Sequence, residues 1–170
     1  REFGLTSIYG GFEPIYNCLF NPGSINLLTS ADKTRVRSMF SDKTMVMFDG
    51  LPIPDDMKPN KRFERIDGFL NLSPVEGASG AGSQVWCVET ASSDSAAKNV
   101  ESFRAMSIFL DELFLHPRAS QVLASSQSCV MQNFVKKGHI VLGGSCGAET
   151  DEEATIMRDN AKMVESLLTS

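Results

Sequence analysis

The sequence has few of the residues that build metal and redox sites. It holds four cysteines and two histidines among 170 residues, and no two cysteines stand in a CxxC spacing. A structural zinc site or a redox dithiol needs clustered ligands of this kind, so we expect no metal and no cofactor. Cys87 and Cys129 lie within apolar runs, which favours free thiols buried in a core.

Long apolar runs and an excess of positive charge are also missing. No stretch approaches the roughly 18 apolar residues of a membrane span, so we expect no membrane partner. The formal net charge is −5, which argues against broad binding to a nucleic-acid backbone but allows a single nucleotide in a pocket. With 42% hydrophobic and 22% charged residues, the composition is typical of a globular domain.

We expect residues 1–170 to form a single domain, because this length suits one hydrophobic core. The chain begins with Arg1 and ends within a predicted helix, which indicates a domain excised from a larger protein. Residues 50–82 hold several prolines and a glycine- and serine-rich stretch. They predict an irregular, loop-rich insertion with one strand.

The hydrophobic pattern predicts a sheet with two main helices. We expect strands within 5–20 on either side of a bend at Gly10-Gly11, and at 33–39, 43–49, 63–72, 84–90, 128–135 and 139–143. Apolar residues at three- and four-residue intervals predict a long helix at about 94–115, followed by a short one to about 126. Thr150 and Glu153 match a capping box that begins a C-terminal helix. The class is α+β, a mostly antiparallel sheet packed against one long central helix and the C-terminal helix.

One motif suggests catalysis. Gly143–Gly147 match the G-x-S-x-G string of a nucleophile elbow, which would make Ser145 or Cys146 the nucleophile of a small hydrolase. In that fold the histidine follows the nucleophile in sequence, whereas His116 and His139 both precede it. The favoured alternative is a glycine loop between a strand and a helix, so we expect no catalytic residue.

Aromatic residues near charges form a second candidate site. Phe40 beside Asp42, at a predicted hairpin tip, supplies the parts that hold a purine base: a ring that stacks and a carboxylate that accepts from the base edge. Tyr9, Phe12 and Trp86 lie on other predicted strands or turns. The alternative is that these aromatics are ordinary core residues.

Short segments spread along the chain match, in order, segments of one known family. They are Tyr9-Gly10-Gly11-Phe12, Leu28-Thr29, Arg35-Val36-Arg37, Thr44-Met45-Val46, the strand 84–90 with Asp94 and Ala105-Met106, and Asn160-Ala161-Lys162-Met163-Val164. Together they resemble the cap-binding domain in the middle of the orthomyxovirus polymerase basic protein two. The pattern is closest to a divergent member, such as that of a thogotovirus or a quaranjavirus.

The resemblance implies a non-catalytic domain of a viral RNA polymerase subunit, which binds the 7-methylguanosine cap of host mRNA for cap snatching and viral transcription. It implies other viral polymerase subunits as partners, and a location in the virion and the host cell nucleus. The family's two stacking positions fall near Phe40 and at Ile108, beside Phe109, with Asp42 as the acidic reader. Because Ile108 has no ring, and stacking contributes about 1–3 kcal/mol per base, we expect cap affinity to be reduced or lost.

A third alternative is a structural or interaction module without a small ligand, held in place by the rest of its parent chain. A large apolar surface left exposed on the folded domain would favour this alternative over the other two.

Overall fold

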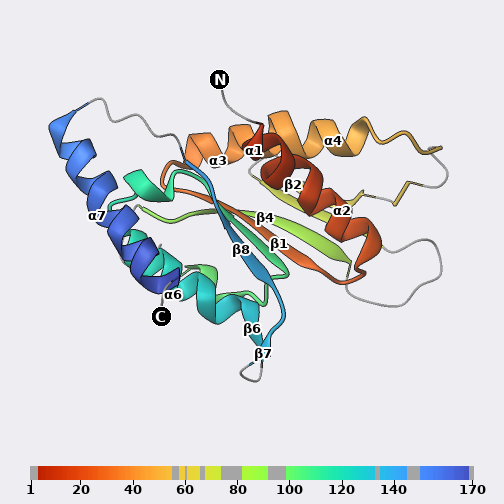
Figure 1. Ribbon diagram of the computed structural model, residues 1–170. Coiled ribbons are helices and arrows are strands. Elements are labelled where there is room, and N and C mark those ends of the chain that lie inside the picture. The colour runs from red at the N-terminus through yellow and green to blue at the C-terminus, as the bar shows by residue number, and fades with distance from the viewer. Residues whose placement is uncertain are drawn as a thin grey trace.

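A six-stranded sheet runs through the middle of the molecule, in the order β2-β3-β4-β1-β5-β8 (Figure 1). The computed structural model describes residues 4–54, 58–59, 61–65, 68–73, 82–91, 99–132, 135–144 and 150–168. The strands of the sheet are β1 (Ile25–Ser30), β2 (Lys61–Arg65), β3 (Phe69–Leu72), β4 (Ser83–Glu89), β5 (Ser107–Leu110) and β8 (His139–Leu142). The pairings β4–β1, β1–β5 and β5–β8 are parallel, whereas β2 and β3 add an antiparallel hairpin at one edge.

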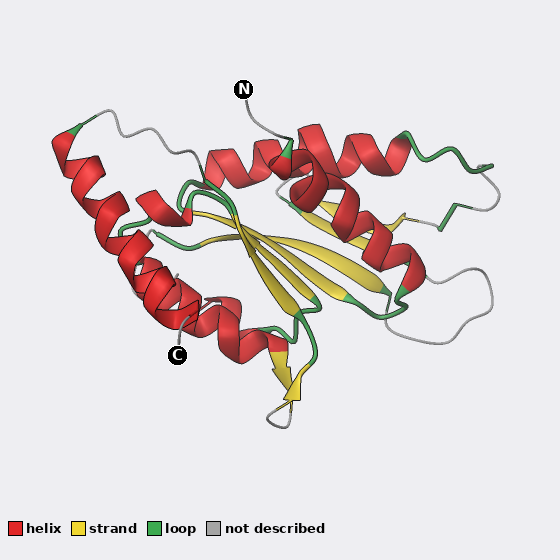
Figure 2. Cartoon of the chain, viewed as in Figure 1, coloured by secondary structure: helices red, strands yellow, loops and turns green. Residues whose placement is uncertain are grey.

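Helices cover both faces of this sheet (Figure 2). The N-terminal helices pack on one face: α1 (Leu5–Ser7), η1 (Ile8–Phe12), α2 (Glu13–Phe20), α3 (Lys33–Met39), η2 (Phe40–Met45) and α4 (Val46–Asp49). The other face is covered by α6 (Ala119–Val130) and α7 (Asp151–Leu168). Helices and strands in one unit confirm the predicted α+β class, although the sheet is mixed rather than mostly antiparallel.

The two central strands separate two hydrophobic cores. Side chains on a strand alternate between the faces of the sheet. On β1, Leu27 therefore packs against α6 and Leu28 against α2 and α3. On β5, Ile108 and Phe109 divide in the same way. These strands are buried on both faces because parallel strands lie between layers of helices.

The predicted strands within 5–20 are wrong, because this segment is a continuous helical run with a π-helical turn at η1. Gly10 and Gly11 are not a bend: they let η1 cross closely over η2, which is also π-helical. Thr44 Oγ1 donates to Gly10 O at 2.6 Å across this crossing. A Cβ at Gly10 would lie 2.7 Å from Met39 Sδ.

The predicted strands at 33–39 and 43–49 are also wrong, because α3, η2 and α4 form one helical segment. Asp32 caps it, since its carboxylate accepts from Thr34 N at 2.7 Å. Val36, Met39 and Phe40 recur at helical spacing and are all buried against the sheet. This longer pattern outweighs the local polar–apolar alternation around Val36.

The long helix predicted at 94–115 is not present in the described part of that range. Residues 99–102 form a 3₁₀ turn, η4 (Asn99–Ser102), then β5 follows, and then a second turn, η5 (Leu113–Leu115). Residues 94–98 lie outside the described residues. A short buried strand and a buried helix share the same continuous apolar pattern, which explains the error.

Several other predictions are confirmed. The strands at 84–90 and 139–143 correspond to β4 and β8, and α7 follows Thr150, whose Oγ1 accepts from Glu153 N at 3.2 Å.

Two other predicted strands differ from the structure. The strand predicted at 63–72 is instead a hairpin of β2 and β3. The strand predicted at 128–135 begins within α6 and continues into a small hairpin of β6 (Met131–Gln132) and β7 (Val135–Lys136).

Candidate interaction surface

Seven exposed apolar side chains lie on the outer side of the N-terminal helices, and we call them the aromatic face. They are Leu5, Ile8, Phe12, Tyr16 and Phe20 on α1–η1–α2, with Val46 and Met47 on α4. Between 37% and 66% of each residue is exposed. Large apolar residues exposed together in this way mark interaction surfaces more often than isolated ones do.

The aromatic face forms because residues 5–20 are apolar on two sides of the helix. One side, with Gly10, Gly11, Ile15 and Cys18, is buried against the sheet and η2. The other side repeats at intervals of three or four residues and points to solvent. A surface helix of a globular protein normally has a polar outer side, so a second apolar stripe that faces solvent is unusual.

The aromatic face is continuous. The rings of Phe12 and Tyr16 have centroids 5.9 Å apart, and those of Tyr16 and Phe20 lie 4.7 Å apart. On α4, Met47 Cγ lies 3.2 Å from where a Cβ of Gly11 would stand, and Lys43 Cβ of η2 lies equally close, so both border the crossing of η1 and η2 beside this row. At the far end, Phe20 also lines a groove of about 430 Å³ with Leu19, Ile53, Pro59 and Leu72 among its walls.

None of the seven side chains is charged, and the one acidic residue of α2 lies off the face. Glu13 contacts His139 Nε2 at the start of β8 and is only 19% exposed. Depletion of charge with enrichment of aromatic residues is the compositional mark of the centre of a protein–protein interface.

A second cluster lies at the carboxyl ends of the parallel strands, where ligands bind in many open α/β sheets. Arg35, which follows β1, contacts Asp111 Oδ2 through Nε at 2.7 Å and Glu112 Oε1 through Nη2 at 2.7 Å. Both acidic residues follow β5. Glu112 has a φ of 54°, a left-handed conformation that non-glycine residues rarely adopt. Because both carboxylates already engage the guanidinium, this cluster is a clamp between β1 and β5.

His116 beside this edge is a buried, neutral residue. Its Nδ1 accepts from Arg118 N at 2.9 Å, so Nε2 carries the proton and donates to Thr90 Oγ1 at 2.9 Å. Burial, followed by the nearby Arg118 charge, lowers the pKa of His116 to about 4. With both ring nitrogens occupied, His116 does not act as a general base in this arrangement.

Cys18 and Cys129 are buried free thiols, whereas Cys87 is half-buried. Burial raises the pKa of Cys18 to about 12 and also raises that of Cys129. Both stay protonated at neutral pH and are poor nucleophiles. Ser145 and Cys146 of the hydrolase motif lie outside the described residues, so that alternative stays a prediction.

The residues of the predicted base-binding site do not form one surface. Phe40 and Phe109 are buried in the same core, and the ring of Tyr9 stacks on that of Phe109 with centroids 6.2 Å apart. Trp86 lies on the opposite side of the sheet, where it packs against Phe69 and Phe103. Phe12 alone belongs to the aromatic face.

The hairpin tip predicted for Phe40 and Asp42 is wrong, because both residues lie on η2. Asp42 is exposed, and its two carboxylate oxygens accept from Ser38 Oγ and Ser41 Oγ, each at 2.8 Å. These hydrogen bonds, that of Ser38 first, lower the pKa of Asp42. Cap binding through these residues stays a prediction.

Most of the aromatic face was not predicted from the sequence. Its signal was present, since Leu5, Ile8, Tyr16 and Phe20 stand at helical spacing with Phe12. The Arg35 clamp carries no comparable signal, because 76 positions separate Arg35 from Asp111.

In the described residues, no helix combines the length and the apolar composition that crossing a membrane requires. No protein-family model matches the chain, and no curated protein matches it.

Proposed function

We propose that this domain is a protein-interaction module that associates with a second copy of itself through the aromatic face. The observation that carries the proposal is the continuous row of exposed apolar side chains, free of charge, along one helical run. A large exposed apolar surface of this kind supports an interaction module.

The size of the aromatic face supports a contact between two copies. An aromatic side chain buries about 150–250 Å², so the three half-exposed rings offer roughly 300 Å². The four aliphatic and methionine side chains bring the total to roughly 500 Å² per copy. Two copies would then bury about 1,000 Å², which is the lower limit for a specific interface.

The shape of the face supports the same partner. The row follows one helical run from Leu5 to Phe20, so it can lie antiparallel against its own copy about a two-fold axis. Near that axis Phe12 and Tyr16 would meet their counterparts. The seven side chains themselves bring no like charges together, although Lys43 of η2 lies beside Met47 at the border of the face.

Sedimentation equilibrium from 5 to 500 µM tests this proposal. We expect a monomer–dimer equilibrium that 0.5 M NaCl does not weaken, because apolar contacts are not screened by salt. Phe12→Glu should weaken it more than tenfold, since it places a carboxylate in the contact. Val135→Glu is the matched control, because Val135 is 53% exposed against 54% for Phe12 but lies on β7.

Two results would overturn the proposal. One is a monomer throughout the concentration range. The other is an equal loss of association in Phe12→Glu and Val135→Glu, which would show that the aromatic face is not the contact. Far-UV circular dichroism and the unfolding midpoint establish that both variants are folded.

A further inference from the structure

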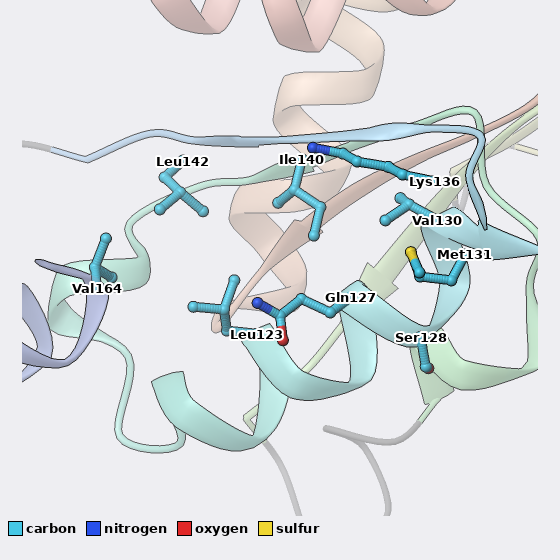
Figure 3. Close-up of a pocket in the computed structure, with 9 residues that line it drawn as sticks. All are labelled: Leu123, Gln127, Ser128, Val130, Met131, Lys136, Ile140, Leu142 and Val164. Carbon is cyan, nitrogen blue, oxygen red and sulfur yellow. The ribbon is translucent and has the colours of Figure 1, made fainter. Parts of the chain in front are cut away.

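A groove of about 570 Å³ lies on the other side of the sheet from the aromatic face, between β8, α6 and α7 (Figure 3). Its apolar walls are Leu123, Val130, Met131, Ile140, Leu142 and Val164. β8 is the last strand of the sheet, so the groove lies beneath a sheet edge. This volume is within the range of small-molecule sites, about 300–1,000 Å³.

The groove is elongated. Ile140 and Leu142 share one face of β8, and Leu123 and Val130 are two turns apart on α6. Val164 of α7 stands at one end and Met131 at the other, with the β8 residues above α6 (Figure 3). An apolar chain can therefore lie along the groove.

Polar groups are few, and one of them is charged. Of the nine lining residues, Lys136 alone is ionisable. Its side chain reaches along β8 toward Ile140, and the amide of Gln127 rises from α6 into the space below (Figure 3). Within the described part of the chain, Lys136 has no salt-bridge partner. The groove thus combines an apolar wall with one cation, one amide and the Ser128 hydroxyl, which already donates to Ser125 O at 2.7 Å.

We propose that this groove binds an apolar chain that ends in a carboxylate, of the medium-chain fatty-acid class. The hydrocarbon chain lies against Leu123, Ile140 and Leu142, and the carboxylate accepts from the Lys136 ammonium. The Gln127 amide, on the opposite wall formed by α6, is the other side-chain N–H donor of the groove. Few polar groups at a mostly apolar site fix the orientation of a ligand in this way.

Decanoate is the probe, and isothermal titration calorimetry with thermal unfolding is the measurement. We expect saturable binding and an unfolding midpoint that rises with decanoate, because the ligand binds the folded state. 1-Decanol should bind at least fivefold more weakly, since it has no carboxylate. Lys136→Glu should weaken decanoate binding at least tenfold. Lys137→Glu changes the same charge one residue away, outside the groove lining, and should alter affinity less than twofold.

Gln127→Trp adds a second, independent variant. Gln127 is exposed, so the substitution preserves the fold while its ring fills the groove, and decanoate binding should disappear. The proposal is overturned if decanoate does not bind at 1 mM or if it lowers the unfolding midpoint. It is equally overturned if Lys136→Glu and Lys137→Glu act alike, if 1-decanol binds as well as decanoate, or if Gln127→Trp has no effect.

Discussion

Arg35 Nε and Asp111 Oδ2 lie 2.7 Å apart, which joins the helix after β1 to the turn after β5. The Arg35 side chain is 45% exposed, whereas that of Asp111 is only 5% exposed. The nearly buried carboxylate of Asp111 therefore lies at the carboxyl ends of the parallel strands, where the half-exposed Arg35 side chain covers it.

Removing that cation should destabilise the fold. Arg35→Ala leaves Asp111 buried without its main partner, and we expect a loss of about 2–3 kcal/mol in the free energy of unfolding, measured with urea. Lys33→Ala on the exposed side of α3 is the control and should change it by less than about 0.5 kcal/mol. Adding Asp111→Asn to Arg35→Ala should restore part of the loss. No recovery in the double variant would contradict a role for the buried charge.

His116 should make stability depend on pH. Its folded pKa of about 4 lies below its value in the unfolded chain, so the unfolded state takes up a proton that the folded state does not. The contribution of neutral His116 to the free energy of unfolding is fully present above about pH 6.5 and is lost as the pH falls toward 4. Between pH 7 and pH 5 this amounts to about 2 kcal/mol. His116→Asn keeps an acceptor for Arg118 N, and its unfolding free energy should fall less over this interval; an unchanged pH dependence would refute the prediction.

Gly138 should not tolerate a side chain. A Cβ there would lie 2.7 Å from Met106 O and closer still to Ala105 O, and both are backbone atoms that cannot turn aside. Gly138→Ala should cost about 1–3 kcal/mol in thermal or urea unfolding. The control is Gly144→Ala, where the nearest atom is Phe114 Cδ2 at 3.2 Å, on a side chain that can shift. Equal effects of the two variants would contradict the close approach at Gly138.

Cap binding has a direct test of its own. The family resemblance predicts that 7-methyl-GTP binds weakly but in preference to GTP, and that Asp42→Asn reduces this preference. Because Asp42 is exposed, the variant should fold normally. Fluorescence titration of both nucleotides measures the preference. Absence of methyl-dependent binding at millimolar nucleotide would end the prediction, with no bearing on self-association.

Local signals made part of the fold predictable. β4 and β8 stand out as apolar runs, and the capping residues Thr150 and Glu153 place the start of α7. The register of the sheet has no such signal. Ser107–Leu110 are buried on all sides only because β1 and β8 flank them, which no local pattern reveals.

The candidate site was less predictable than the fold. Gly10 and Gly11 are compatible with two structures: a Gly-Gly pair is typical of a turn, and it also allows two helices to cross closely. Interpreting it as a turn hid the helical spacing of Phe12, Tyr16 and Phe20. The stacking of Tyr9 on Phe109 joins positions 100 residues apart and depends on the tertiary fold.

Leu27 and Leu28 are neighbours in sequence but face different cores, and Ile108 and Phe109 divide in the same way. The layer between these cores is one strand thick and is packed on both sides. A fatty acid in the groove and a second copy on the aromatic face would therefore bind on opposite faces of the same sheet. Their binding free energies should add independently, unless a shift of β1 or β5 transmits a change from one side to the other.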